Sequence, residues 1–380
     1  TEDCMNKKDL INKITNNMFL LADKYGKPAV DGLIKSCCIG FENVTGEFCG
    51  YRNRTKKPSE QIVKSVATLH GTKVAIVIQG PIMEEDKFTL ETIKWYRKMY
   101  PDIIIILSTW EDAAQKAVDE IQKLKVEVIK NKRPESSGLG NINFQAVSSK
   151  MGVKAALDAG AEYVLKTRTD QRIYRRHFLE FFLFLISTHK LTKQCGNQQE
   201  RIIYFQGTVD GNMFIPYFMS DFLYFGRTDD IRRLFDIDMD MSVNVSKDER
   251  RKDLKKLVEK NPSIIEYYNE TAPEIRIIKN YIKKYISSEI DDSVYSYWNF
   301  VKNYCICISW DDIELFWPKY NRYAESRMSK TYRRDDSVVL NSAYCWTYNN
   351  WLMLQNGYLK YSKDLEDICQ KSVKELEIKL

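Results

Sequence analysis

The sequence predicts an α/β fold with a mostly parallel sheet flanked by helices. After residue 73, short apolar runs typical of buried parallel strands alternate with longer helical patterns. Four of these runs end abruptly in polar residues, and parallel strands bring their carboxyl ends to one edge of a sheet. We therefore expect a ligand to bind at that edge.

The four runs define the predicted strands and the residues that each delivers to the edge. They cover residues 74–78, 103–107, 126–129 and 163–167. The polar residues that follow them are Gln79-Gly80-Pro81, Ser108-Thr109-Trp110, Asn131 and Arg168-Thr169-Asp170. The fourth run is the most informative, because an apolar strand gives way to an arginine and an aspartate.

Helical patterns separate the predicted strands. The first begins near Thr89, a suitable N-cap residue, carries Glu91 in its first turn and ends before Pro101. The second places apolar residues at 114, 118, 121 and 124 on one face, and the third spans about 141–159. Strands that alternate with helices in this way require right-handed crossovers, which make the sheet mostly parallel.

The flanking regions differ from this core. Residues 1–70 predict a helical N-terminal extension, because apolar residues recur at helical spacing until Gly26 and Pro28 interrupt them. The core spans 71–245 and includes apparent strands at 202–205 and 217–225. Residues 246–380 predict a helical and mixed C-terminal region on the acceptor side, with capping-box sequences at 246–249 and 271–274.

Composition excludes several classes of protein. The 58 basic and 52 acidic side chains of this 380-residue chain leave a net charge of only +6. Basic blocks with interleaved aromatic residues are missing, so we expect no nucleic-acid partner. The longest apolar stretch, 178–186, is interrupted by Glu180 and is too short to span a membrane. No signal peptide is visible in the sequence.

Common cofactor motifs are also missing. Gly138-Leu139-Gly140 lacks the third glycine of a dinucleotide-binding motif, and neither a P-loop nor a serine nucleophile elbow occurs. The nine cysteines form no CxxC pair and the chain has three histidines, so structural zinc is not expected. Buried thiols in a reducing compartment explain the cysteines better than disulfides do.

Arg168 and Asp170 permit two interpretations. A hard cation such as Mg²⁺ or Mn²⁺ takes oxygen ligands and often needs only one or two carboxylates plus substrate phosphates, so Asp170 is a candidate metal ligand. Such a cation, or Arg168 alone, could neutralise the pyrophosphate leaving group of a nucleotide-sugar. Alternatively, the two side chains form an ion pair that only stabilises the strand end. The residues by themselves leave both interpretations open.

Five segments resemble the WavE family of bacterial glycosyltransferases of lipopolysaccharide and capsule synthesis. They stand in the family order at 77–82 (VIQGPI), 106–111 (ILSTWE), 141–149 (NINFQAVSS), 163–170 (YVLKTRTD) and 220–226 (SDFLYFG). The resemblance covers about 70–240, and 310–320 more loosely. Two positions depart from the family pattern: Phe144 stands where an arginine is usual, and Thr169 where a serine is common.

The resemblance implies a GT-A-like, Rossmann-like fold that binds a nucleotide-sugar donor. Because Arg168-Thr169-Asp170 is not an Asp-x-Asp motif, metal dependence is less firmly implied than in typical enzymes of this fold. Replacement of the family arginine by Phe144 removes a phosphate contact that the third helix would otherwise supply.

Each candidate binding residue has a structural alternative. Gln79, Gly80 and Pro81 leave the first strand where a base or ribose would lie, or they form a tight turn. Trp110, after Ser108 and Thr109, stacks on the base or packs in the core. Asn143 contacts ligand or caps its helix, and Lys166 is a binding residue or an ion-paired core lysine. Together with Arg168, these residues are the substrate-binding candidates.

Two carboxylates compete for the role of general base. Asp221 is predicted on a strand rich in Phe and Tyr, and apolar surroundings raise the pKa of a carboxylate, which suits a base. Glu274 is the rival, but as the last residue of the 271–274 capping box it already has a structural role. Asp221 is therefore ranked first, with Asp170 as the second catalytic residue.

The expected function is transfer of a sugar from a nucleotide donor, UDP-linked, to a hydroxyl of a growing surface glycan, with inversion. One alternative is a nucleotidyltransferase, although Gln79-Gly80-Pro81 is followed by the acidic run 84–86 rather than a basic glycine-rich loop. Another is a non-catalytic glycan-binding protein. Thermal shifts with a nucleotide panel would distinguish the three.

The helix that begins near Ala272 carries basic residues beside aliphatic and aromatic ones. Arg276, Lys279, Lys283 and Lys284 alternate with Ile277, Ile278, Tyr281 and Ile282. This spacing suits either peripheral contact with an anionic membrane or an ordinary packed helix with a solvated basic face. The family resemblance implies a lipid-linked acceptor at the inner face of the membrane, so we expect a cytoplasmic enzyme that associates with that membrane peripherally.

Overall fold

The computed structural model describes residues 7–46, 48–49, 53–61, 68–191, 196–206, 212–241, 268–269, 272–318 and 345–379. It divides the chain into two compact units, Thr1–Arg54 and Thr55–Leu380. The sequence pattern at 246–249 that suggested a capping box lies outside the described residues.

The first unit is a helical hairpin. Helix α1 (Lys7–Tyr25) and helix α2 (Lys27–Thr45) are separated by Gly26, which has a positive φ of 70°. Pro28 in the first turn of α2 fits a helix start, because its ring sets φ and its missing N–H is not needed there. Large apolar side chains, among them Phe19 and Val44, remain exposed on this unit.

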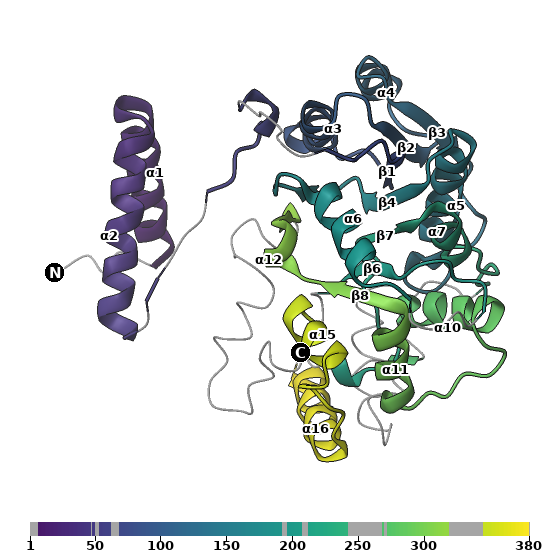
Figure 1. The fold of residues 1–380 in the computed structure, drawn as a ribbon. Helices are drawn as coiled ribbons and strands as arrows, with labels where there is room; N and C mark the ends of the chain where they lie inside the picture. Colours follow the sequence, from purple (N-terminus) through teal and green to yellow (C-terminus); the bar gives the residue numbers. More distant parts are fainter. Residues whose placement is uncertain are drawn as a thin grey trace. The chain divides into compact units, whose positions relative to one another are not determined.

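The second unit is built on a seven-stranded sheet with the order β3-β2-β1-β4-β7-β6-β8 (Figure 1). The strands are β1 (Val74–Gln79), β2 (Ile104–Trp110), β3 (Glu127–Asn131), β4 (Tyr163–Arg168), β6 (Ile202–Phe205), β7 (Tyr224–Arg227) and β8 (Cys305–Ile308). Strands β1 to β4 pair in parallel, while β7 is antiparallel to both β4 and β6. The predicted mostly parallel α/β sheet is confirmed.

Helices cover the sheet in two groups. Helix α3 (Phe88–Met99) contacts α4 (Gln115–Gln122) and, through the Tyr96–Phe178 ring pair, α6 (Phe178–Thr188). Helix α5 (Ile142–Asp158) packs on β1 and β2 and against α7 (Thr228–Leu234). Right-handed crossovers explain this grouping. The chain moves outward along the sheet from β1 to β3, so α3 and α4 lie on the same face of the sheet. It returns from β3 to β4 through α5, which therefore lies on the opposite face.

The remaining elements of the unit are helices from its C-terminal half and short helices between the strands and helices described above. They are α10 (Pro273–Tyr285), α11 (Val294–Tyr304), α12 (Trp310–Ile313), α15 (Tyr348–Gln355), α16 (Lys363–Lys379) and the short helices η1 (Pro58–Glu60), η2 (Glu85–Lys87), η3 (Leu139–Asn141) and η4 (Asn212–Phe214). Strand β5 (Arg172–Ile173) pairs with β9 (Leu315–Phe316) in a second, two-stranded sheet. Strand β8 adds to the main sheet beside β6, so C-terminal residues form part of the core.

Two predicted boundaries were wrong for identifiable reasons. Thr89 is not an N-cap, because α3 starts at Phe88 and Lys87 occupies the cap. The Thr89 hydroxyl instead accepts from the Met83 N–H at 2.8 Å and donates to the Thr169 carbonyl at 2.9 Å. The expected strand at 217–225 begins only at Tyr224, since irregular backbone with buried side chains precedes it.

Helix α10 faces inward with its apolar residues. Ile277, Ile278, Tyr281 and Ile282 are buried. Ion pairs join Arg276 to Asp240, Lys279 to Asp292 and Lys284 to Asp238. The packed-helix alternative therefore describes α10, and any contact of this helix with a membrane would depend on its basic residues alone.

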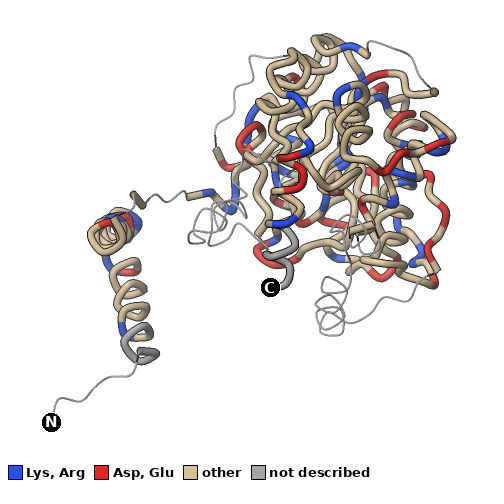
Figure 2. Tube along the Cα trace, turned by 90° about the horizontal axis from the view of Figure 1, so that it is seen from below, with Lys and Arg blue, Asp and Glu red and all other residues tan. Residues whose placement is uncertain are grey.

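Basic and acidic positions are interspersed along the second unit (Figure 2). Across the part of the chain that the structure describes, no helix is long and apolar enough to cross a membrane.

Candidate active site

The carboxyl ends of the central strands meet at one edge of the sheet. The register places Gln79 of β1 between Ser108 of β2 and Arg168 of β4. Asp221 reaches the same edge from the loop before β7, because β7 runs antiparallel to β4. Gln79 and Asp221 are far apart in the sequence, and the topology of the sheet brings both of them to this edge.

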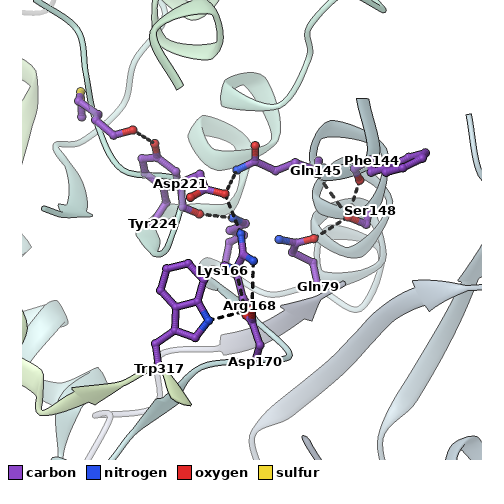
Figure 3. A network of polar contacts seen from close by, with 11 residues as sticks. Gln79, Phe144, Gln145, Ser148, Lys166, Arg168, Asp170, Asp221, Tyr224 and Trp317 are labelled. Atoms are coloured by element: carbon purple, nitrogen blue, oxygen red, sulfur yellow. Dashed lines mark hydrogen bonds and ion pairs between the residues drawn. The ribbon is translucent and has the colours of Figure 1, made fainter. Parts of the chain in front are cut away.

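Arg168 is the centre of the polar network at this edge (Figure 3). Its Nε and Nη2 donate to the two carboxylate oxygens of Asp170 at 3.0 and 3.1 Å. Its Nη1 donates to Asp221 Oδ2 at 3.0 Å. Although partial burial acts against its charge, the Asp221 and Asp170 carboxylates hold the pKa of Arg168 above its ordinary value. The predicted Arg168–Asp170 ion pair therefore exists, and it extends to a third residue.

Trp317 closes one side of this network. Pairing of β9 with β5 brings the indole beside the end of β4, where its Nε1 donates to Asp170 Oδ2 at 2.9 Å. The Arg168 guanidinium lies 5.1 Å from the centre of the indole ring, and Phe222 packs edge-on against the indole. Sequence analysis did not single out Trp317, since only the short β5–β9 pairing reveals its proximity.

Lys166 is buried beneath the network. Its Nζ donates to the backbone carbonyl of Asp221 and lies 5.2 and 5.9 Å from the ring centres of Phe235 and Tyr224. Burial lowers the pKa of Lys166 to about 8, although the nearby Asp221 carboxylate raises it. Lys166 is a core lysine that fixes the Asp221 backbone, and its side chain does not reach the surface.

The surroundings of Asp221 differ from the apolar environment that the sequence suggested. Its Oδ2 accepts hydrogen bonds from Arg168 and, at 2.6 Å, from Gln145 Nε2 of α5. Pattern reasoning about 217–225 placed it on a strand among aromatic residues and could not foresee charged and amide donors from β4 and α5. The carboxylate is part of an ion-pair network.

The first strand ends in a strained, tightly packed turn. Gly80 has a φ of +119°, and a Cβ at this position would lie 2.9 Å from Thr169 Oγ1. Only glycine fits such a conformation and approach. The Gln79 side chain is 5% exposed and accepts a hydrogen bond from Ser148 Oγ at 2.7 Å, while Pro81 is exposed. A tight turn at residues 79–81 does not exclude contact of the same residues with a ligand.

The end of β2 is mostly internal. Ser108 and Thr109 are fully buried, and Asn131 Nδ2 donates to Ser108 Oγ and to the Thr109 carbonyl, both at 2.8 Å. The Trp110 indole is 3% exposed and packs edge-on against Phe144, with ring centres 5.4 Å apart. Of the two roles predicted for Trp110, packing in the core therefore accounts for most of its side chain.

A positive charge lies beside Phe144 although this residue is not itself an arginine. The Arg133 guanidinium lies 5.1 Å from the Trp110 ring centre and 5.7 Å from that of Phe144. Its Nε and Nη2 donate to the two carboxylate oxygens of Asp112 at 2.9–3.1 Å. A cation from the loop after β3 thus stands near the position where the family pattern has one on the helix.

Asn143 has a structural role that neither expectation covered. The N-cap of α5 is Asn141, so Asn143 is not the capping residue. Its amide donates to the Ser136 and Asp240 carbonyls at 2.9 and 2.7 Å, and its Oδ1 accepts from the Asp240 N–H at 2.9 Å. At 1% exposure, it fastens the loop before α5 to the chain after α7.

Glu274 belongs to this site more closely than its sequence context suggested. The N-cap of α10 is Ala272, without a side-chain cap, so the predicted capping box does not account for Glu274; Thr271 lies outside the described residues. Burial raises the pKa of Glu274 to about 7, and the Asp221 carboxylate adds to this effect. Arg168 and Lys166 act in the opposite direction.

A divalent cation does not fit Asp170 in this arrangement. Both Asp170 oxygens already accept hydrogen bonds from Arg168, and one also accepts from Trp317. A cation on this carboxylate would stand next to the Arg168 guanidinium, which repels it. Within the described ranges, no group of three or more His, Cys, Asp or Glu side chains is arranged to hold a metal.

Comparison with known proteins identifies a family and distant structural resemblances. Residues 74–369 match the family model described as WavE lipopolysaccharide synthesis. No curated protein sequence matches the chain significantly.

Three solved structures illustrate the structural resemblance. The mannose-1-phosphate geranyltransferase of Thermus thermophilus is 13% identical with a TM-score of 0.24, over 36% of this chain and 41% of that one. A glucose-1-phosphate thymidylyltransferase from Bacillus anthracis is 10% identical at 0.28, over 44% and 76%. The 4-diphosphocytidyl-2C-methyl-D-erythritolsynthase of Anaerococcus prevotii is 14% identical at 0.29, over 56% and 99%. These TM-scores are too low to support an inference about this chain.

Proposed function

The chain belongs to the WavE family of lipopolysaccharide synthesis, and we propose that it is a glycosyltransferase using a nucleotide-sugar donor. The acceptor is a hydroxyl of a growing surface glycan. The observation that carries this proposal is the Arg168 network at the carboxyl edge of a parallel sheet, the edge at which α/β proteins bind ligands.

Arg168 is the group we assign to the donor diphosphate. Its guanidinium has N–H groups beyond those given to Asp170 and Asp221, and it stays charged at every working pH. Fixed donors of this kind stabilise the negative charge that develops on a departing diphosphate. The two carboxylates that hold the guanidinium keep it in place before the donor arrives, which avoids reorganisation during the reaction.

The base and ribose of the donor, UDP in our proposal, are assigned to the adjoining strand ends. Gln79, Gly80 and Pro81 form the nearest turn, and its glycine lets a ligand approach the backbone closely. Ser108, Thr109 and Asn143 support this region from within rather than contact ligand directly, since all three are buried.

Transfer by a single inverting displacement is the simplest mechanism for such a site. An acceptor hydroxyl attacks the anomeric carbon while the bond to the diphosphate breaks, and a carboxylate removes the hydroxyl proton. Asp221, which is hydrogen-bonded to Arg168, and Glu274, which interacts with Arg168 electrostatically, are our candidates for this last role. No step is assigned to a metal ion.

The proposal is tested by turnover of nucleotide-sugars. The purified chain is incubated with UDP-, dTDP-, GDP- and CMP-sugars, and release of free nucleotide is measured. We expect turnover of one donor class, and a fall of about 10²-fold or more for Asp170→Ala and Asp221→Ala. Asp364→Ala, an exposed aspartate on α16, is the matched control. Unchanged turnover in both site variants would remove these residues from the mechanism.

The alternative functions give different outcomes in a binding experiment on the same protein. Stabilisation by a nucleoside triphosphate, with none by nucleoside diphosphates, would indicate a nucleotidyltransferase. Stabilisation by oligosaccharides alone would indicate a glycan-binding protein. Either pattern contradicts the glycosyltransferase proposal.

Peripheral attachment at the cytoplasmic face of a membrane is a separate proposal. It is supported by the exposed basic residues at the end of α10, Lys283 and Lys284, since anionic lipid attracts each such residue by ~1 kcal/mol. Co-sedimentation with anionic vesicles at low salt tests it. Binding that is unchanged after Lys283→Gln and Lys284→Gln would show that this helix is not the contact.

A further inference from the structure

Glu274 is held rigidly at the start of α10, next to the network described above. A Cβ built on Gly140 would lie 2.8 Å from Pro273 Cγ, so the first turn of α10 packs tightly on η3. Two residues beyond Glu274, Arg276 Nη1 donates to Asp240 Oδ2 at 2.6 Å, and the same oxygen accepts from the Leu139 N–H at 3.0 Å. Contacts on both sides of Glu274 therefore fix its backbone.

The Glu274 side chain lies within electrostatic range of groups from β4, from the loop before β7 and from β7. It interacts electrostatically with Lys166 and Arg168 of β4, with Asp221 in the loop before β7, and with Tyr224 of β7. Its own helix adds Arg276, which is engaged by Asp240. Glu274 is partly exposed, whereas Lys166 is fully buried.

The two candidate bases, Asp221 and Glu274, differ in their contacts. Asp221 Oδ2 accepts from both Arg168 and Gln145, and its backbone carbonyl accepts from Lys166. Both side-chain hydrogen bonds fall on one carboxylate oxygen and tie Asp221 to the Arg168 guanidinium and to α5. Its position suits it to hold Arg168 in place.

We infer that Glu274 is the general base of the proposed glycosyl transfer and that Asp221 is a positioning residue for Arg168. This inference rests on the proposed function. The acceptor O–H proton passes to a Glu274 carboxylate oxygen as the acceptor oxygen forms its bond to the anomeric carbon. The bond from that carbon to the donor diphosphate breaks, and the nucleoside diphosphate leaves with the electron pair beside Arg168.

The electrostatics of the site agree with this division of roles. Burial, followed by the Asp221 carboxylate, raises the pKa of Glu274 to about 7. A base works best when its pKa lies near the operating pH, since it is then sufficiently ionised and still a strong acceptor. Deprotonated Glu274 is the active form, so activity rises with pH through about 7.

The test compares Glu274→Gln, Glu274→Asp and Asp221→Asn in the full chain, with exposed Glu289→Gln as the control. Turnover is measured with the nucleotide-sugar that the wild type consumes, and binding with the matching nucleoside diphosphate. Glu274→Gln should bind nucleotide within about 3-fold of wild type while kcat falls about 10²- to 10⁴-fold, and the acid limb of its pH profile should vanish. Asp221→Asn should weaken nucleotide binding, since Arg168 loses a partner.

The outcomes separate this inference from the function beneath it. A wild-type chain that neither binds nor consumes any nucleotide-sugar refutes the proposed function itself. Wild-type turnover in Glu274→Gln refutes the inference and leaves the function standing. Should Glu274→Gln fail to fold, Glu274→Asp must keep the acid limb at a reduced kcat. A Glu274 carboxyl that titrates by NMR near the ordinary value of about 4.3 would also overturn the inference.

Discussion

At the scale of single residues, the site depends on a close approach between two strand ends. Gly80 leaves room for Thr169 Oγ1, and the Thr169 carbonyl accepts from Thr89, so β1, β4 and α3 meet at one point. The two strand ends are also joined by the Thr169 N–H, which donates to the Gln79 carbonyl at 3.0 Å. Changes here should affect stability and ligand binding together.

Gly80→Ala is expected to destabilise the protein by about 1–3 kcal/mol, because alanine disfavours a positive φ and its Cβ would press on Thr169. Gly160→Ala is the matched control, with a φ of +78° and open space around the added Cβ. Chemical denaturation measures both free energies of unfolding. A loss for Gly80→Ala no larger than that for Gly160→Ala would show that the Thr169 contact is unimportant.

Metal removal provides a second prediction at this scale. Arg168 supplies positive charge beside Asp170, whose two oxygens both accept hydrogen bonds, so EDTA should leave nucleoside diphosphate affinity unchanged within about 2-fold. Calorimetric titration with and without EDTA is the measurement. An increase in affinity of more than about 10-fold on adding Mn²⁺ would contradict this expectation.

The sequence predicted the members of this site better than their roles. Arg168 and Asp170 were identified because an apolar strand ends at charged residues, whereas Asp221 was identified as a carboxylate within a stretch rich in Phe and Tyr. The donors to Asp221 could not be predicted, because Gln145 comes from another element and the orientation of a side chain in a loop has no sequence signature. Glu274 was ranked second because a capping-box pattern matched residues 271–274, whereas the helix begins with Ala272 as its N-cap.

At the scale of elements, the start of α7 supports the far side of the sheet. Asp230 is fully buried and accepts hydrogen bonds from the Gln199 and Glu200 N–H groups, which precede β6. Burial raises the pKa of Asp230 to about 6, although these hydrogen bonds lower it. Helix α7 thus stabilises β6 through a carboxyl group that binds a proton more tightly in the folded than in the unfolded state.

The sign of the pH effect follows from that raised pKa. Between about pH 4 and 6 the folded state holds a proton that the unfolded state has lost, so this group's contribution to stability falls as pH rises and then levels off. Asp230→Asn should remove this slope. Denaturation at about pH 4.5 and 7 checks it: the wild type should lose more stability over this interval than the variant. An equal loss in both would contradict the assignment.

Strands and helices with regular patterns were predicted well, and the additions to the sheet were not. Strands β1, β2 and β4 contain buried apolar runs that hydrophobicity identifies, while β3 is shorter and mixes Val128 and Ile129 with polar residues. The residues at 217–223 are equally apolar but form irregular buried backbone, since β7 begins only at Tyr224. Strand β8 comes from a region expected to be helical or mixed, and its pairing with β6 is a long-range contact that no local pattern records.

At the scale of the whole molecule, the sheet and the candidate site lie within one of the two compact units. All described strands and every residue of the Arg168 network fall in Thr55–Leu380. A chain that begins at Thr55 should therefore fold with a thermal midpoint within about 3 °C of the full chain and bind nucleotide equally well. A lower midpoint or weaker binding would show that the helical hairpin supports the second unit.

The central claim is that Arg168 binds the diphosphate of a nucleotide donor at the carboxyl edge of the sheet, and calorimetric titration tests it most directly. UDP and the other nucleoside diphosphates are titrated into the wild type and into Arg168→Gln, with exposed Arg175→Gln as the matched control. We predict that one nucleoside diphosphate binds to wild type and control alike, and that Arg168→Gln lowers this affinity by at least about 10-fold. Equal binding by all three proteins, or binding by none of them, would contradict the claim.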